Sequence, residues 1–268
     1  MARWQDGEIR AGVERARPQG GRVRPGRAVG LVALAAAVAG LTWAVSYAIV
    51  MQPHVDALPT LVRARLKTHG GGAYVPYGRL PPFLVDALVA TEDRTFWTNA
   101  GLSFEGIARA AVVDIEHGAF VQGASTIQQQ VVRDMFLSAR KTLPRKLQGS
   151  VLAVLMTLDF PRREILSLYF NEVYLGQGAY GIARAARTYF GKSPSALTPA
   201  QCAVLAGLPQ APSYDDPLTN YAAAKARQAI VLESMVATGY ITAARARALA
   251  RAPLGLVRAP AHGVAAAS

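Results

Sequence analysis

The stretch AVGLVALAAAVAGLTWAVSYAIVM, residues 28–51, decides how the chain is organised, because it contains no charged residue. At about 1.5 Å of rise per residue, a helix over this stretch is roughly 36 Å long and can cross a hydrocarbon core of about 30 Å. A cleaved signal peptide usually has a shorter apolar run, of about 7–15 residues. A buried core helix is usually shorter and apolar on one side only. The sequence therefore predicts a single transmembrane signal-anchor helix over residues 28–52.

The charges around this stretch predict its orientation. Residues 1–27 hold three acidic residues against seven arginines, at positions 3, 10, 15, 17, 22, 24 and 27. Cytoplasmic flanks of membrane helices carry an excess of Lys and Arg. We therefore expect residues 1–27 to be a basic cytoplasmic tail and everything after residue 52 to lie outside the membrane. This placement argues against nucleic acid as a partner.

The composition narrows the remaining possibilities. The formal net charge of +12 over 268 residues indicates an anionic partner, such as lipid headgroups or a phosphorylated substrate. Cys202 is the single cysteine, so the chain forms no intrachain disulfide and no Cys-based metal site. The four histidines are isolated from one another, which argues against a zinc site. Residues 53–255 are long enough for one globular domain, followed by a flexible tail over residues 256–268.

Helix signals recur throughout residues 53–255, whereas alternating strand patterns are absent except for a weak candidate at 73–80. The signals are prolines at first helical turns, Ser or Thr caps and glycine stops. One predicted helix begins at Pro81-Pro82 and runs to Thr91, and a second runs from Ser103 to Gly118. A third begins at the Thr198–Gln201 capping box and ends before Pro209. A fourth runs from about Tyr221 to Thr238, before Gly239, and a fifth begins at Thr242. The pattern predicts an all-α domain.

Two short motifs suggest other functions, and both are rejected. The glycines at 176, 178 and 181 have the spacing of a dinucleotide-binding loop, but the preceding stretch is predicted to be helical and no acidic residue follows before Asp215. Residues 138–141 read S-x-x-K, as in penicillin-binding enzymes, but the accompanying S-D-N and K-T-G elements are absent.

The residues with chemical potential are concentrated between Thr91 and Asn171. Glu92 and Asp93 form an acidic pair at a predicted helix end, a feature that is more often a solvated surface. A polar run over residues 123–130 is followed by five basic residues: Arg133, Arg140, Lys141, Arg145 and Lys146. Clustered Arg and Lys suit a diphosphate, although a solvated basic face is the plain alternative. Part of the polar run also fits ordinary capping boxes, Ser125 with Gln128 and Thr126 with Gln129.

In these segments the chain resembles family 51 of the glycosyltransferases. This family comprises the peptidoglycan polymerases that occur as monofunctional enzymes and as the transglycosylase domain of class A penicillin-binding proteins. EDRTFWTNAG at 92–101 resembles the family motif E-D-x-x-F-x-x-H-x-G, GASTIQQQ at 123–130 resembles G-G-S-T-I-T-Q-Q, and RKLQG at 145–149 resembles R-K-x-x-E. Further matches are YFN at 169–171, GQGAYGIARAARTYFGKSP at 176–194 and LPQAPS at 208–213. The likeness covers about residues 80–255.

The resemblance implies a lysozyme-like, two-lobed helical domain behind a single N-terminal transmembrane helix, in the bacterial inner (cytoplasmic) membrane. It implies polymerisation of lipid II into glycan strands, by inverting transfer from a lipid-diphosphate donor to an acceptor sugar hydroxyl. Glu92 would be the catalytic base, and a divalent cation, Mg or Mn, could bind at the diphosphate, with no metal site built from protein alone. The partners would be lipid II, the lipid-linked glycan chain, the membrane and a separate transpeptidase. The substrate-binding residues implied by the match are Ser125, Thr126, Gln129, Gln130, Arg133, Lys141, Arg145, Lys146 and Asn171.

Three departures from the family pattern leave alternatives open. The motif-one histidine is Asn99, the motif-three glutamate is Gly149, and Ser167 stands where the family usually has glutamate, after a stretch about two residues short. An active polymerase could use Glu92 alone or with a substitute acid. The candidate substitutes are Glu105, Glu116 and Glu172. The second hypothesis is a catalytically impaired lipid II-binding or scaffold homologue, and the third is a glycan-cleaving enzyme, which the basic residues argue against.

Overall fold

The computed structural model describes residues 25–70, 72–103, 105–106, 125–138, 140 and 142–257. Most of the expected basic tail, nearly all of the expected C-terminal tail, and most of the helix predicted from Ser103 to Gly118 lie outside the described residues. The chain divides into two compact units, Met1–Trp43 and Ala44–Ser268, and each is considered by itself.

Helix α1, Pro25–Asp56, contains the whole predicted membrane segment and enters the second unit at Ala44. Over Val29–Asp56 it is the one helix of the described chain that is long and apolar enough to cross a membrane, with a mean hydropathy of 2.0. Its apolar side chains in the first unit, such as Leu31 and Leu41, are exposed. A core helix of a soluble protein would bury them, whereas a lipid-facing helix does not.

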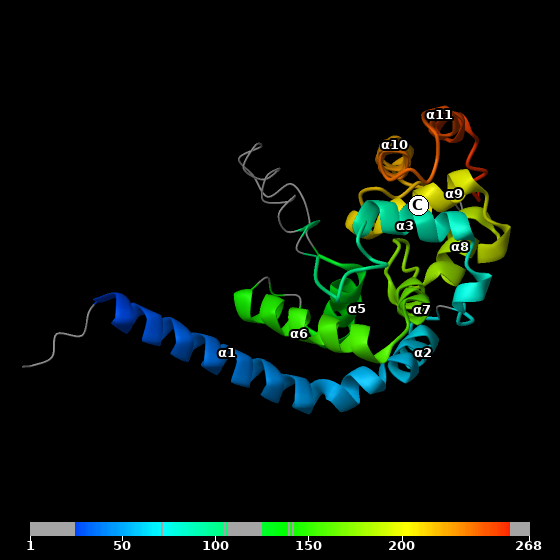
Figure 1. Cartoon of the computed structure of the whole chain (residues 1–268). Helices are drawn as coiled ribbons and strands as arrows, with labels where there is room; N and C mark the ends of the chain where they lie inside the picture. The colour runs from blue at the N-terminus through cyan, green and yellow to red at the C-terminus, as the bar shows by residue number, and fades with distance from the viewer. Residues whose placement is uncertain are drawn as a thin grey trace, which may run out of the picture. The chain divides into compact units, whose positions relative to one another are not determined.

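The described part of the second unit is built of helices, and it contains no β-strand beyond an isolated bridge between Tyr174 and Tyr180. Two sets of helices are visible (Figure 1): α3 packs with α9 and α10, and α5 packs with α6 and α7, with α2 against α7. The α-helices after α1 are α2 (Leu58–Thr68), α3 (Pro82–Glu92), α5 (Ile127–Phe136), α6 (Leu143–Asp159), α7 (Arg162–Glu172), α8 (Ile182–Phe190), α9 (Pro199–Gly207), α10 (Tyr221–Ala237) and α11 (Ala243–Arg251). Short 3₁₀ helices lie at Tyr77–Arg79, Pro194–Ala196 and Leu208–Gln210.

Most of the helix boundaries predicted from capping signals are confirmed. Thr198 forms a complete capping box with Gln201 at the start of α9. Pro82 begins α3, Thr242 caps α11, and Gly239, with φ of +77°, follows the end of α10. The weak strand candidate at 73–80 is wrong, because this segment contains the 3₁₀ turn Tyr77–Arg79 and pairs with no strand.

The packing of α3 fixes where the acidic pair lies. Leu84 and Leu88 of α3 are fully buried against α9 and α10. Burying a leucine side chain contributes about 1.5–3 kcal/mol, so α3 is held firmly along its length. Its last residue is Glu92, which therefore leaves a rigid helix at the junction between the two sets of helices.

Candidate active site

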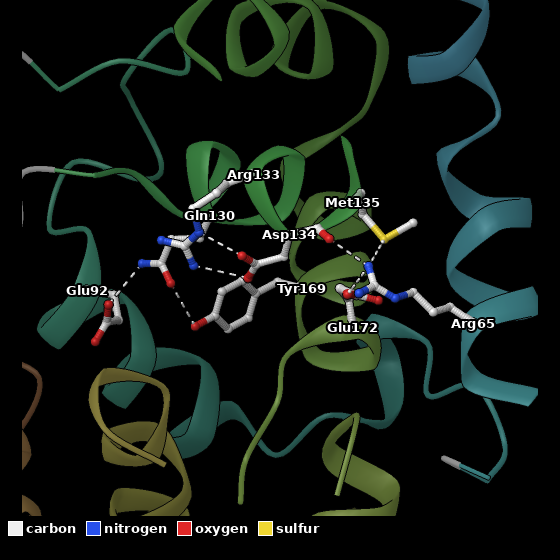
Figure 2. A network of polar contacts seen from close by, with 8 residues as sticks. All are labelled: Arg65, Glu92, Gln130, Arg133, Asp134, Met135, Tyr169 and Glu172. Carbon is white, nitrogen blue, oxygen red and sulfur yellow. Dashed lines mark hydrogen bonds and ion pairs between the residues drawn. The ribbon is translucent and has the colours of Figure 1, made fainter. Parts of the chain in front are cut away.

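Glu92 lies at the end of α3 with contacts to both sets of helices. Its Oε2 accepts a hydrogen bond from Gln130 Nε2 of α5 at 2.9 Å (Figure 2), and its Oε1 lies 3.5 Å from Arg227 Nη2 of α10. The side chain is 12% exposed. Burial raises the pKa of Glu92, while the hydrogen bond from Gln130 and the charges of Arg227 and Arg133 oppose the rise. The result is a largely buried carboxylate that holds a proton more readily than a surface glutamate.

The neighbouring Asp93 has a structural role. Its carboxylate accepts hydrogen bonds from Asn99 Nδ2, at 3.1 and 3.0 Å, from Thr95 Oγ1 at 3.0 Å and from the Ile127 amide at 3.2 Å. Ile127 is the first residue of α5, where a carboxylate satisfies a free N–H and meets the positive end of the helix dipole. Asp93 therefore joins the first motif to the start of α5.

Asn99, which replaces the family's histidine, completes the same connection. Its Oδ1 accepts hydrogen bonds from the Gly101 amide at 2.9 Å and from Gln128 Nε2 at 3.1 Å, while its Nδ2 donates to Asp93. Asn99 is buried. An amide can donate and accept at once, so this replacement keeps the two motifs joined.

Two of the predicted substrate-binding residues are used to begin α5. Thr126 and Gln129 form a reciprocal capping box, and Thr126 Oγ1 also donates to the Gly101 carbonyl at 2.7 Å. Thr126 is 1% exposed. Gln129 Nε2 donates to Ser150 Oγ of α6 at 3.2 Å. These contacts favour the plain capping interpretation for Thr126 and Gln129, whereas the preceding Ser125 is exposed.

Gln130 and Arg133 lie one helical turn apart on α5 and face the region of Glu92. Gln130 Oε1 accepts a hydrogen bond from the buried Tyr169 hydroxyl at 3.4 Å. Arg133 is 43% exposed and pairs with Asp134, with Nε–Oδ1 of 2.6 Å and Nη2–Oδ2 of 3.1 Å. That hydrogen bond raises the pKa of Arg133, which stays cationic and partly open to a ligand.

The third motif lies on α6, which packs against α5. Lys146 is exposed, and Arg145 Nε is a buried donor with no partner among the described residues. Gly149 is buried, and a Cβ there would lie 3.3 Å from Leu137 Cδ1. Because glycine has no side chain, α6 carries no acid at this position. Lys141, the remaining basic candidate, lies outside the described residues.

Asn171 and the three candidate substitute acids make no described contact with Glu92. Asn171 is buried and forms hydrogen bonds with both backbone groups of Val75, each at 2.8 Å, and with the Ser167 carbonyl at 2.7 Å. These bonds indicate a structural role. Glu172 is 5% exposed and pairs with Arg65 at 2.8 Å. Glu105 is exposed, and Glu116 lies outside the described residues.

Arg227 is the site residue that sequence reasoning missed. It lies on α10, its Nε donates to the Gly207 carbonyl at 3.0 Å, and its Nη2 faces Glu92. The two residues are 135 positions apart. No helical spacing or motif signals such a pair, so only the packing of α10 on α3 reveals it.

Comparisons with known proteins identify the family of this chain. The transglycosylase family model matches residues 61–236. A protein of Cupriavidus necator named as a transglycosylase is 47% identical over 169 residues, covering 63% of this chain and 73% of that protein. Penicillin-binding protein 1A of Aquifex aeolicus is 42% identical over 169 residues, covering 63% of this chain but 23% of that protein. The chain therefore spans less than a quarter of that longer relative.

A solved structure is also similar. The crystal structure of penicillin-binding protein 1A from Haemophilus influenzae matches with 26% identity and a TM-score of 0.42, covering 69% of this chain and 18% of that chain. The family model covers more than half of the chain, so the chain belongs to the transglycosylase family. The expected all-α class is confirmed for the described residues, with one apolar helix at the N-terminal side.

Proposed function

We propose that this chain is a membrane-anchored peptidoglycan glycosyltransferase that polymerises lipid II into glycan strands. Glu92 would take the proton from the acceptor sugar hydroxyl, whose oxygen attacks the anomeric carbon of the donor with inversion. The bond from that carbon to the lipid diphosphate breaks, and the diphosphate leaves with the electron pair. The main support for this proposal is the placement of Glu92, which is a largely buried carboxylate near the cationic Arg133. A raised pKa strengthens a general base, provided that it loses its proton near the working pH.

The leaving diphosphate needs its charge neutralised rather than protonated. Arg133, Arg145 and Lys146 are the described cations among the predicted substrate-binding residues. The described residues contain no group of three or more His, Cys, Asp or Glu suited to a metal ion, and Asp93 is already engaged by Asn99, Thr95 and Ile127. A divalent cation would come with the diphosphate itself, and loss of activity in EDTA, restored by Mg or Mn, tests this.

Purified full-length chain with labelled lipid II tests the main proposal. We expect labelled glycan chains longer than one disaccharide unit. If lipid II binds but no chain forms, the protein is instead a lipid II-binding homologue without turnover. If no chain forms and isolated peptidoglycan is digested, the protein is a glycan-cleaving enzyme.

The impaired homologue is the second candidate, because Gly149 leaves α6 without the carboxylate of the family motif. A side chain at position 149 would require Leu137 Cδ1, 3.3 Å from a Cβ there, to shift slightly. Glu172 is held by Arg65, which argues against it as the substitute. The active proposal therefore rests on Glu92 without a second acid among the residues just considered.

The proposed orientation places residues after 52 outside the membrane, where lipid II is polymerised and where a separate transpeptidase would crosslink the strands. A protease added to intact spheroplasts should digest this region and spare the N-terminal arginines. Protection of the C-terminal region would reverse the orientation.

A further inference from the structure

Helix α5 carries two side chains of the candidate site, so its position controls their approach to Glu92. Its N-terminal end is fixed by Asp93 and by the Thr126 capping box. The last four carbonyl groups of a helix lack partners within the helix, and this end carries partial negative charge. One of these carbonyls, that of Asp134, accepts a hydrogen bond from Arg65 Nη1 of α2 at 2.6 Å.

The same nitrogen of Arg65 makes two further contacts (Figure 2). Its Nη1 lies 2.8 Å from Glu172 Oε1 of α7 and 3.4 Å from Met135 Sδ of α5. Arg65 is 36% exposed, whereas Glu172 is almost fully buried. One guanidinium group thus joins three helices at the C-terminal ends of α5 and α7, where two negative helix ends and a buried carboxylate need a cation.

We propose that Arg65, paired with Glu172, is a positioning residue that holds α5 so that Gln130 and Arg133 meet Glu92. Asp134 is one helical turn from Gln130 and next to Arg133, so a shift of this helix end moves both side chains. We call the contacts of Arg65 with the Asp134 carbonyl and with Glu172 the clamp. The effect of the clamp on turnover rests on the proposed function, but its effect on the position of α5 does not.

A purely stabilising Arg65 would behave differently. Its loss would lower the melting temperature and leave the turnover of each folded molecule unchanged. A positioning Arg65 affects turnover and the pH dependence of the rate as well. The groups that face Glu92 are Gln130, Arg227, Arg133, Tyr169 and Asp93, and the clamp controls the two that α5 carries.

The test compares Arg65→Met with Arg63→Met in the full-length protein. Arg63 is an exposed cation on the same helix, stacked 4.6 Å from the Tyr74 ring centroid, and serves as the matched control. For Arg65→Met we expect kcat to fall about 10- to 100-fold, since a misplacement of about 1 Å can cost 100-fold. The KM for lipid II should change little. The rising limb of the pH–rate profile should move to higher pH, because Glu92 loses the hydrogen bond from Gln130 and the charge of Arg133. Arg63→Met should match the parent.

Two further variants protect the test against misfolding. Arg65→Met strands the buried Glu172 carboxylate, so the double variant Arg65→Met/Glu172→Gln removes that charge as well. We expect the double variant to fold and still to show the lowered kcat, because the bond to the Asp134 carbonyl is missing. Arg65→Lys keeps the charge with a single point of contact and should recover part of the rate.

Hydrogen exchange separates the clamp from the proposed function. Amides of α5 should exchange faster in Arg65→Met than in Arg63→Met, while amides of α9 stay equally protected. If the parent makes no glycan chains, the proposed function fails, and this exchange comparison alone decides the clamp. Parental kcat, pH profile and α5 exchange in folded Arg65→Met would overturn the clamp.

Discussion

Glu92 and Glu172 are two largely buried carboxylates in similar local positions but with different surroundings. Each is the last residue of a helix, α3 or α7, where the negative end of the helix disfavours an acid. Burial raises the pKa of both, that of Glu172 from 4.5 to about 7. Glu172 is held by Arg65 at 2.8 Å, whereas Glu92 lies 3.5 Å from Arg227 and is hydrogen bonded to a neutral amide.

The difference shows that the partner of a buried carboxylate decides whether its side chain is held in a structural contact or stays available for chemistry. The tight pair ties Glu172 into a structural contact between α2, α5 and α7. Glu92 has a longer ionic contact and accepts its hydrogen bond from a neutral amide. For this reason we assign the base to Glu92 and a structural role to Glu172, although both were candidates from the sequence.

Neutralising each carboxylate in turn should produce the largest difference between Glu92 and Glu172. Glu92→Gln should lower the rate of polymerisation by about 10²–10⁴-fold, because it removes the base and keeps the bulk. Glu172→Gln should stay near the parental rate, because its amide oxygen can still accept from Arg65. Initial rates with labelled lipid II measure both. Glu233→Gln on the exposed face of α10 is the control, and equal losses at 92 and 172 would contradict the assignment.

The stability of the domain should report Glu172 through its pH dependence. Between pH 4.5 and about 7 the folded state keeps a proton on Glu172 that the unfolded state has lost. This contribution therefore favours folding at low pH and is lost as the pH rises through that window. Thermal unfolding of parent and Glu172→Gln across this range measures it. Parallel curves for the two proteins would show that Glu172 does not titrate in this way.

Removing Arg227 tests how its positive charge controls the pKa of Glu92. In Arg227→Met the carboxylate loses a positive charge that opposes its raised pKa, so the pKa of Glu92 should rise further. The rising limb of the pH–rate profile should move to higher pH, with the rate restored in part at alkaline pH. Arg247→Met, on α11 and without a contact to Glu92 among the bonds described, is the control. An unchanged limb in Arg227→Met would show that the pair is absent in solution.

The smallest effects are expected at Gly149. Gly149→Ala should change the free energy of unfolding by less than about 1 kcal/mol, since better helix propensity is offset by the close approach to Leu137. Gly149→Glu should alter the rate of an active enzyme little, because Glu92 acts without a second acid. Lipid II polymerisation by both variants checks this. A large gain with Gly149→Glu and none with Gly149→Ala would identify the parent as an impaired homologue.

Much of the fold and part of the candidate site follow from short-range signals. The apolar run, the prolines, Thr198, Thr242 and Gly239 predict the membrane helix and ends of α3, α9, α10 and α11, because their effects act within about four residues. The match to the family motifs predicts that Glu92, Gln130 and Arg133 belong to one site. The segment at 73–80 was mistaken for a weak strand, because strand character depends on a partner that local sequence does not show.

Local sequence predicted the membrane helix, the bounds of several other helices and the motifs that carry carboxylates and cations. The tertiary structure alone decided their partners. It joined Arg227 to Glu92 and Arg65 to Glu172, pairs separated by 135 and 107 residues, and it used Thr126 and Asn171 for structure. The physical reason is that helix formation depends on neighbours along the chain. The pKa and availability of a carboxylate depend instead on burial and on charges brought close by packing.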